Sequence, residues 1–255
     1  MKCAACLIIL AMTGIPTAED TRPDLDELVE HLDRLYRSDD SYSEMTMTIE
    51  TPNWTRTLTM KAWSRGTDRT FIRILSPARD AGMATLRIDD QMWNYLPNTN
   101  STVRVPPSMM SGSWMGSDIT NNDIVREITY EEGYTYSYLP DSAFSGDIDQ
   151  GTVIIELVPR RSTAVVWSSI VIAIRLDDLI PLWERYYDSG GDLIRTITFS
   201  EVQEMGGRTI PTVMEVVPAD EEGNRTNIRW TSAEFDRGVG EDTFTLRNLQ
   251  SGGTG

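Results

Sequence analysis

The chain has 255 residues, a formal net charge of −16 and two cysteines, Cys3 and Cys6. This length fits one large domain or two small ones. Because nucleic acids and anionic membrane surfaces repel so negative a protein, we expect neither as a partner.

Residues 1–18 have the pattern of a cleaved secretory signal peptide. Lys2 supplies the positive start, Ala4–Thr13 form a mostly apolar run, and small residues lead to Ala18. The run is shorter than the roughly 20 residues that span a bilayer. We therefore expect export to the periplasm. Both cysteines leave with the signal, so no disulfide or reactive thiol is expected in the mature chain.

The segment 23–37 predicts an amphipathic helix. Its apolar residues recur three and four positions apart, so they share one helix face. Asp24 precedes Glu27 by three positions, which is typical of an N-cap. A helix this short is unstable alone, so the apolar face must pack against the rest of the chain. That face comprises Leu25, Leu28, Val29, Leu32, Leu35 and Tyr36.

From about residue 43 the apolar residues alternate with polar ones, which indicates β-strands with one apolar face. Turn sequences at 190–191, 206–207 and 222–224 separate several of these runs. The pattern predicts a mainly β (α+β) fold with one antiparallel sheet, strongly curved or rolled. The alternating runs are 44–50, 57–63, 69–76, 84–90, 91–97, 102–106, 134–140, 152–159, 169–178, 182–188, 193–202, 209–218 and 226–235.

The segment 106–126 interrupts the alternation. Two prolines at 106–107 end the preceding strand, and residues 120–123 form a weak helix-start signal. We expect an apolar loop with a short helix that acts as a lid over part of the concave face. Its large apolar side chains are Met109, Met110, Trp114 and Met115.

Methionine is concentrated in the first half of the chain. Of the ten that follow Met12, eight lie between Met45 and Met115. Any single methionine is explained by core filling, but the group suits an adaptable apolar surface. Since the helix and the lid cover only part of the concave face, we expect an apolar ligand-binding cavity beneath them. Its predicted lining residues are Met45, Met47, Ile49, Leu58, Met60, Ile72, Ile74 and Trp93.

The sequence offers little support for catalysis or metal binding. His31 is the one histidine, and neither a G-x-S-x-G motif nor a phosphate-binding loop occurs. Residues 118–123 could hold a hard cation, although caps and turns account for them, and the segment 147–158 lacks the final glutamate of a calcium loop. A pair of catalytic carboxylates stays open as an alternative. We expect no enzymatic activity, no metal and no cofactor.

Alternating strands in an exported protein also fit an outer-membrane barrel. Several arginines, including Arg73, Arg87 and Arg195, lie inside the runs. A lipid-facing arginine at mid-membrane costs about 2–4 kcal/mol, which argues against this alternative, although positions facing the lumen could accept one.

Several motifs carry a family resemblance: Ser76-Pro77, Ala81-Gly82, MWNYLP at 92–97, SMMSGSWMGSD at 108–118 and PLWERYYDSGGDLIRTITF at 181–199. With them, residues 25–250 resemble the outer membrane lipoprotein-sorting proteins of the LolA-like superfamily. The resemblance implies an unclosed antiparallel barrel of about 11–12 strands, with an N-terminal helix and a helical lid over an apolar cavity.

The resemblance also implies a function. It indicates a periplasmic carrier that binds lipoprotein acyl chains or other lipids for transfer toward the outer membrane. An inner-membrane transporter and an outer-membrane acceptor would then be its partners. The alternative is a non-shuttling envelope sensor or interaction module of the same fold, an accessory to a transporter of the resistance–nodulation–division (RND) superfamily.

No linker, repeat or low-complexity tract divides the sequence. We therefore expect residues 19–250 to form one lipid- or lipoprotein-binding domain, followed by a disordered tail at 251–255. We expect the protein to be a monomer.

Overall fold

The computed structural model describes residues 22–125, 129–140, 149–161, 163 and 165–251. The predicted signal peptide lies outside these residues, as does the predicted tail apart from Ser251. The described chain forms one antiparallel sheet of 13 strands with four α-helices, so the fold is mainly β as expected. The strand count exceeds the expected 11–12 because even the short runs at 102–106 and 134–140 pair as strands.

The helices cluster at a few places in the chain. They are α1 (Leu25–Arg34), α2 (Asn121–Val125), α3 (Tyr130–Gly133) and α4 (Leu246–Gln250), with 3-10 turns η2 (Pro97–Thr99), η3 (Pro107–Met109) and η5 (Glu241–Phe244). The strands are β1 (Asp40–Glu50), β2 (Thr55–Arg65), β3 (Arg69–Ser76), β4 (Ala84–Ile88), β5 (Gln91–Leu96), β6 (Ser101–Arg104), β7 (Tyr134–Tyr138), β8 (Thr152–Pro159), β9 (Ser169–Arg175), β10 (Ile180–Tyr187), β11 (Leu193–Met205), β12 (Arg208–Pro218) and β13 (Arg225–Phe235).

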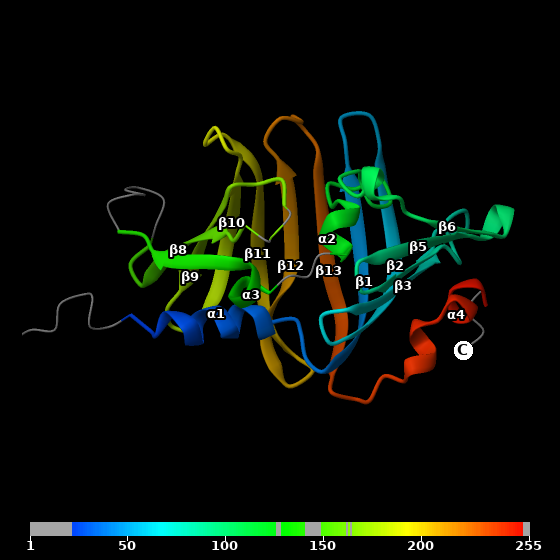
Figure 1. Cartoon of the computed structure of the whole chain (residues 1–255), viewed down its shortest axis with the longest axis horizontal. Helices are drawn as coiled ribbons and strands as arrows, with labels where there is room; N and C mark the ends of the chain where they lie inside the picture. The colour runs from blue at the N-terminus through cyan, green and yellow to red at the C-terminus, as the bar shows by residue number, and fades with distance from the viewer. Residues whose placement is uncertain (1–21, 126–128, 141–148, 162, 164, 252–255) are drawn as a thin grey trace, which may run out of the picture.

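The sheet consists of two meanders joined at the centre. Strands β1 to β6 follow one another to one edge, β13 back to β7 follow one another to the other edge, and β1 pairs with β13. The edge strands β6 and β7 do not pair with each other, so the sheet is not closed. Figure 1 shows the strands turning from upright at the centre to nearly horizontal at both flanks, which reflects strong twist.

The alternating apolar residues predicted for the strands form the inner, buried face of the sheet. Across β1 and β2, Met45 lies opposite Met60 and Met47 opposite Leu58, so these four side chains share one face. Met47 and Leu58 are fully buried there in the main core. Each buried side chain of this size contributes roughly 1.5–3 kcal/mol of transfer free energy.

Helix α1 packs its apolar face onto this main core, as predicted. The Asp24 carboxylate caps the helix by accepting hydrogen bonds from the amides of Asp26 and Glu27. Leu28 and Val29 are fully buried in the main core. In Figure 1, α1 (blue) runs along the lower left of the sheet and α2 (green) lies over its centre.

The C-terminal segment covers a different part of the sheet. Phe244 and Leu249 pack with Phe71 and Leu86 in a second core cluster, and the Arg73 guanidinium donates to the Asn248 carbonyl at 2.7 Å. On β3, Phe71 belongs to this cluster whereas the next residue, Ile72, belongs to the main core. The alternation therefore places the second cluster on the outer face of the sheet.

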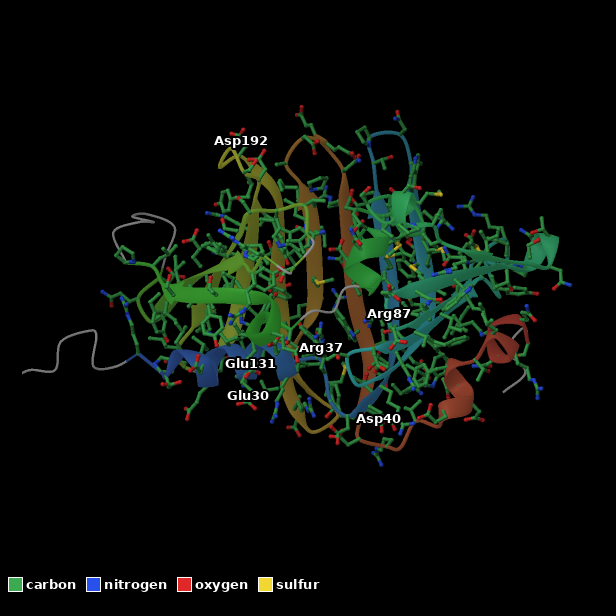
Figure 2. All side chains as sticks on the ribbon, in the orientation of Figure 1. Glu30, Arg37, Asp40, Arg87, Glu131 and Asp192 are labelled. Atoms are coloured by element: carbon green, nitrogen blue, oxygen red, sulfur yellow. The ribbon has the colours of Figure 1, made fainter. Side chains whose placement is uncertain are left out.

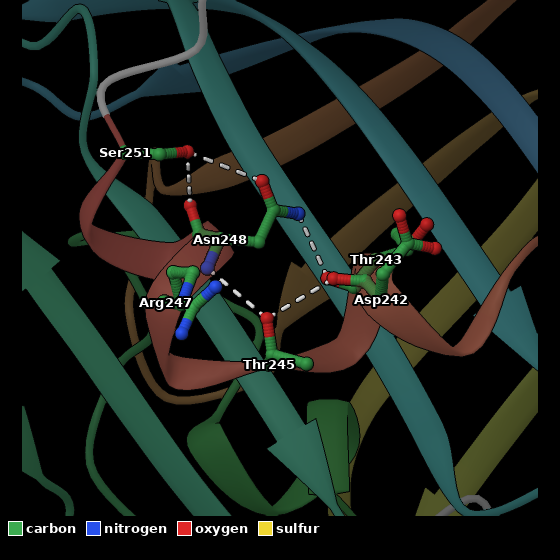
Figure 3. A pocket seen from close by; sticks show the side chains of 6 residues that line it. All are labelled: Asp242, Thr243, Thr245, Arg247, Asn248 and Ser251. Carbon is green, nitrogen blue, oxygen red and sulfur yellow. Dashed lines mark hydrogen bonds between the residues drawn. The ribbon is translucent and has the colours of Figure 1, made fainter.

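A shallow hollow lies on this C-terminal segment (Figure 3). Its polar groups bond one another: the Asn248 side chain donates to the Thr243 carbonyl, and the Ser251 hydroxyl donates to Asn248. Because its lining residues all come from the short segment 242–251, the hollow has the features of a local turn. Within the described chain, no helix is long and apolar enough to cross a membrane.

Candidate ligand-binding cavity

A cavity of about 410 Å³ lies between the inner face of the sheet and the helices α1, α2 and α3. This volume is within the range of roughly 300–1,000 Å³ that is typical of small-molecule sites. Most of its wall is apolar, which suits an apolar ligand. The apolar lining includes Leu32, Leu35, Met45, Met60, Ala62, Ile72, Trp114, Ile119, Ile124, Ile170, Ile197, Phe199, Met214, Val216, Ile228 and Trp230.

The structure brings together only part of the predicted ligand-binding set. Met45, Met60, Ile72 and Trp114 line the cavity. Four more predicted residues are completely or almost completely buried in the main core and do not line it. These are Met47, Ile49, Leu58 and Ile74.

Trp93 lies elsewhere, on the outer face with the C-terminal cluster. Its neighbour Met92 takes the inward position in the main core. Adjacent residues of a strand point to opposite faces of the sheet, so only one of Met92 and Trp93 can face inward. The run MWNYLP has apolar residues at both sets of alternating positions, so its pattern does not show which face is the inner one. The inner position two residues on, Asn94, accepts a hydrogen bond from Thr85 at 2.7 Å.

The predicted lid residues have different environments. Trp114 is buried, and Met110 and Met115 are partly buried against the main core. Met109 is 60% exposed and faces solvent. The role of the predicted residues in ligand binding stays a prediction.

The lid segment is anchored to the sheet at several points. The Trp114 indole donates to the Thr85 hydroxyl at 3.1 Å, and the Arg56 guanidinium donates to the Met115 carbonyl at 3.1 Å. The Thr226 hydroxyl donates to the Asp118 carboxylate at 2.7 Å. These contacts come from β4, β2 and β13 respectively, so the segment is held across the sheet.

A polar cluster interrupts the apolar wall on the side of β10 and β11. Glu184 on β10 is buried, and each of its carboxylate oxygens accepts one tyrosine hydroxyl: Tyr130 at 2.8 Å and Tyr186 at 2.7 Å. Tyr130 belongs to α3, so its hydrogen bond to Glu184 ties α3 to β10. Asp33 of α1 also holds α3 in place, because its carboxylate accepts hydrogen bonds from the backbone amides of Tyr130 and Glu131.

An ion pair continues the cluster. Arg195 on β11 donates twice to the Asp123 carboxylate of α2, at 2.8 and 2.9 Å. The Arg195 guanidinium also lies 4.3 Å from the ring centre of Tyr186 and 5.3 Å from that of Trp167. The Trp167 indole in turn donates to the Tyr134 hydroxyl at 3.0 Å. We call Asp123, Tyr130, Tyr134, Trp167, Glu184, Tyr186 and Arg195 the polar cluster; all seven line the cavity.

Burial controls the protonation of this cluster. Loss of solvent raises the pKa of Glu184, against the lowering effect of the tyrosine hydroxyls and the Arg195 charge. Burial also acts to raise the pKa of Asp123, but the hydrogen bonds and charge of Arg195 outweigh it and hold that pKa below its ordinary value. The cluster therefore combines a carboxyl group whose pKa is lowered by its ion pair with another whose pKa is raised by burial.

Comparison with known proteins places the chain in a family. No curated protein matches the sequence. A family model described as "-like: Uncharacterized protein" matches residues 66–251. The chain belongs to this family.

Solved structures show which fold this family member has. A DUF1329 family protein from Desulfovibrio piger is 29% identical, with 88% of this chain and 97% of that chain covered and a TM-score of 0.76. A putative outer membrane lipoprotein-sorting protein domain from Vibrio parahaemolyticus is 22% identical, with 88% and 97% covered and a TM-score of 0.72. A LolA superfamily protein from Nitrosomonas europaea is 18% identical, with 87% and 97% covered and a TM-score of 0.69. The chain has the LolA-like fold.

Sequence reasoning missed most of the polar cluster of this LolA-like chain. In the run LWERYYD, both phases carry aromatic residues: Trp183 and Tyr187 pack in a cluster on the outer face, and Tyr186 packs in the main core. The apolar pattern therefore does not reveal that Glu184 faces inward. One signal could have revealed the buried carboxyl group. Glu184 lies two positions before Tyr186, so the two side chains share one face of the strand.

The residues weighed for other chemistry have structural contacts. His31 is half-buried on α1, its pKa is lowered by burial, and its Nε2 has no hydrogen-bond partner within the described residues. In the segment 118–123, Asp118 bonds Thr226, and Asp123 bonds Arg195. The described residues contain no cluster of three or more metal-ligating side chains; Asp147 of the calcium-like segment lies outside them.

Proposed function

We propose that this protein is a periplasmic carrier that binds lipoprotein acyl chains or other lipids in its cavity and passes them toward the outer membrane. The observation that carries the proposal is the mainly apolar cavity of about 410 Å³ under α1, α2 and α3. One solved protein of the same fold is described as a lipoprotein-sorting domain, which supports a related role here. Export through the signal at residues 1–18 is part of the proposal.

The energetics suit a carrier. Each CH₂ group transferred from water into the cavity contributes about 0.8 kcal/mol, so an acyl chain supplies the main binding free energy. The helices α1, α2 and α3 form the cover of the cavity. Non-covalent contacts hold this cover, such as Asp123 with Arg195 and Tyr130 with Glu184, and these contacts can open for loading and release. The proposed binding residues are the twelve predicted ones, of which Met45, Met60, Ile72 and Trp114 line the cavity. The proposal contains no catalytic step, metal or cofactor.

A cavity-filling variant tests this function. Ala62 lines the cavity and is small, so Ala62→Phe should reduce the binding of a fluorescent acyl probe at least tenfold by occupying the ligand's space. Native mass spectrometry of protein purified from a periplasm, followed by solvent extraction, should identify co-purified lipid in the wild type and much less in the variant.

The matched control is Val103→Phe, which adds a similar ring at a position that is 49% exposed on the edge strand β6. It should bind the probe like the wild type. Absence of both bound lipid and probe uptake in the wild-type protein would contradict the carrier role.

One observation favours the alternative, a non-shuttling sensor or interaction module beside an RND-type transporter. Among the described residues, the edge strand β6 has no strand partner on its outer side, and Val103 on it and Met109 after it are exposed. Such an edge can pair with a partner's strand. Stable co-purification of an envelope protein, unchanged by lipid extraction, would support this alternative, whereas a lipid-dependent encounter with a transporter and an acceptor fits the carrier. We further propose that residues 19–250 act as one domain and that the protein is a monomer.

A further inference from the structure

The cavity wall has two chemically different sides. Strands β1, β2 and β3 contribute apolar side chains such as Met45, Met60 and Ile72, together with uncharged hydroxyl groups. These hydroxyl groups belong to Ser41, Ser43, Ser64 and Thr70. The polar cluster comes from β7, β10, β11 and the helices α2 and α3, with Trp167 shortly before β9. In the order of the sheet, β2, β1, β13 and β12 separate β3 from β11. A ligand that fills the cavity therefore meets uncharged, largely apolar side chains at one side and the charged and tyrosine groups of the polar cluster at the other.

The charges around the cavity disfavour an anionic ligand. Two guanidinium groups line the cavity, those of Arg37 and Arg195, and Arg195 is already paired with Asp123. Glu184 and Asp33 also line the cavity, and burial raises the pKa of both carboxyl groups. Three carboxyl groups and two guanidinium groups therefore line the cavity, and an anion beside Glu184 would add to this excess of acidic groups. An uncharged polar group avoids this repulsion.

The cluster also has an unused donor. The Arg195 Nε–H is buried and has no hydrogen-bond partner within the described residues. A buried donor without a partner costs about 1–3 kcal/mol, and a ligand oxygen that accepts from it would remove that cost. Because Nε is enclosed, the ligand must displace a neighbouring side chain to reach it.

We infer that the cavity selects amphipathic lipids whose polar end is an uncharged oxygen group, a hydroxyl or an ester as in an acylglycerol, and that the polar cluster binds this end. The ligand oxygen accepts from Arg195 Nε–H, and a ligand hydroxyl donates to the oxygens of Glu184 or Tyr130. This inference rests on the proposed function, because it assigns the polar end of the lipid that the cavity carries.

Competition between two lipids of equal chain length tests the inference. The uncharged dye N-phenyl-1-naphthylamine is bound to the protein, and 1-monomyristoylglycerol or myristate displaces it below the micelle threshold. Monomyristoylglycerol should displace the dye at roughly tenfold lower concentration, because one satisfied donor and the avoided repulsion together amount to about 1.4 kcal/mol.

A double variant isolates the cluster. Asp123→Asn with Arg195→Met removes the ion pair and the free donor together, so neither charge is left buried alone. It should bind the dye but lose the tenfold preference. The matched control is Asp178→Asn with Arg175→Met, which removes a bidentate pair of the same kind outside the cavity lining and should keep the preference.

The outcomes separate the two proposals. Equal displacement by the two lipids, a preference for myristate, or a preference that persists in the Asp123/Arg195 variant overturns the inference while leaving a lipid carrier in place. Failure of the wild type to bind the dye and both lipids overturns the proposed function and this inference with it.

Discussion

At the scale of single residues, the cavity depends on a few buried polar groups among many apolar ones. Trp114 shows the pattern: its ring is buried in the main core while its indole N–H reaches the Thr85 hydroxyl. Glu184 shows it more strongly, because a fully enclosed carboxyl group is tolerated only where hydroxyl donors meet both oxygens. Such groups orient a cover or a ligand more precisely than apolar contacts do, since a hydrogen bond has a direction and a hydrophobic contact does not.

The protonation of Glu184 gives a prediction for stability against pH. Its pKa in the folded protein is raised from 4.5, so its contribution to stability is fully present below that value and is lost as pH rises through the folded pKa. The groups that act on it are Arg195, Asp33, Tyr130 and Tyr186. We expect the free energy of unfolding of the wild type to decline relative to Glu184→Gln as pH rises above 4.5, as measured by urea unfolding across a pH series.

Glu201→Gln is the control with the opposite sign. The hydrogen bonds of Arg229 lower the pKa of Glu201, so its contribution is present above the ordinary value and is lost as pH falls. Parallel stability curves for the wild type and Glu184→Gln would mean that Glu184 has an ordinary pKa.

At the scale of elements, the three short helices over the cavity are held by polar side chains. Helices α2 and α3 have five and four residues, too few to be stable alone. Asp123 attaches α2 to β11, Tyr130 attaches α3 to β10, and Asp33 attaches α1 to α3. The cover is therefore a set of elements whose position depends on these contacts.

Removing one attachment should loosen the cover. Tyr130→Phe deletes the hydroxyl that bonds Glu184 and keeps the ring, so it should cost about 1 kcal/mol of stability and speed the uptake of an acyl probe. Stopped-flow fluorescence measures the uptake rate, and urea unfolding measures the stability.

Tyr42→Phe is the matched control. It removes another tyrosine–glutamate hydrogen bond, to Glu44, and Tyr42 does not line the cavity. Uptake should be unchanged in this variant. If Tyr130→Phe took up the probe at the wild-type rate, α3 would not control entry to the cavity.

At the scale of the whole molecule, the sheet has separate tasks on its two faces. The inner face holds the main core and the cavity, and the outer face of β3 and β4 is covered by the C-terminal segment. Figure 2 shows Asp192, at the turn between β10 and β11, at the end of the molecule opposite Glu30 of α1 and Glu131 of α3. Exposed charges thus lie at both ends, while the cavity lies between the sheet and the helices.

This division predicts that stability and binding can be separated. Phe244→Ala should cost about 3–5 kcal/mol by leaving a hole in the outer-face cluster. Below its unfolding transition the variant should still bind an acyl probe like the wild type, because Phe244 does not line the cavity. Thermal unfolding and probe titration on the same sample check both results. Lost binding in a folded Phe244→Ala sample would show that the two faces are coupled.

Much of this architecture was accessible from the sequence. The period of two predicted every strand run, and the spacing of Leu28, Val29 and Leu32 predicted α1 with its Asp24 cap. These features depend on neighbours a few residues apart, and their pattern is therefore written in the local sequence. The alternation in MWNYLP did not decide between Met92 and Trp93, because both phases of that strand are apolar.

The polar side of the cavity was decided only by tertiary structure. Asp123 and Arg195 are 72 residues apart, and Tyr130 and Glu184 are 54 apart. Their meeting depends on the order of strands, on the curvature of the sheet and on where α2 and α3 settle, none of which a local period encodes. By itself the sequence determined a family, a helix and a set of half-apolar strands; the packing of those strands determined which face became the cavity and which charges it encloses.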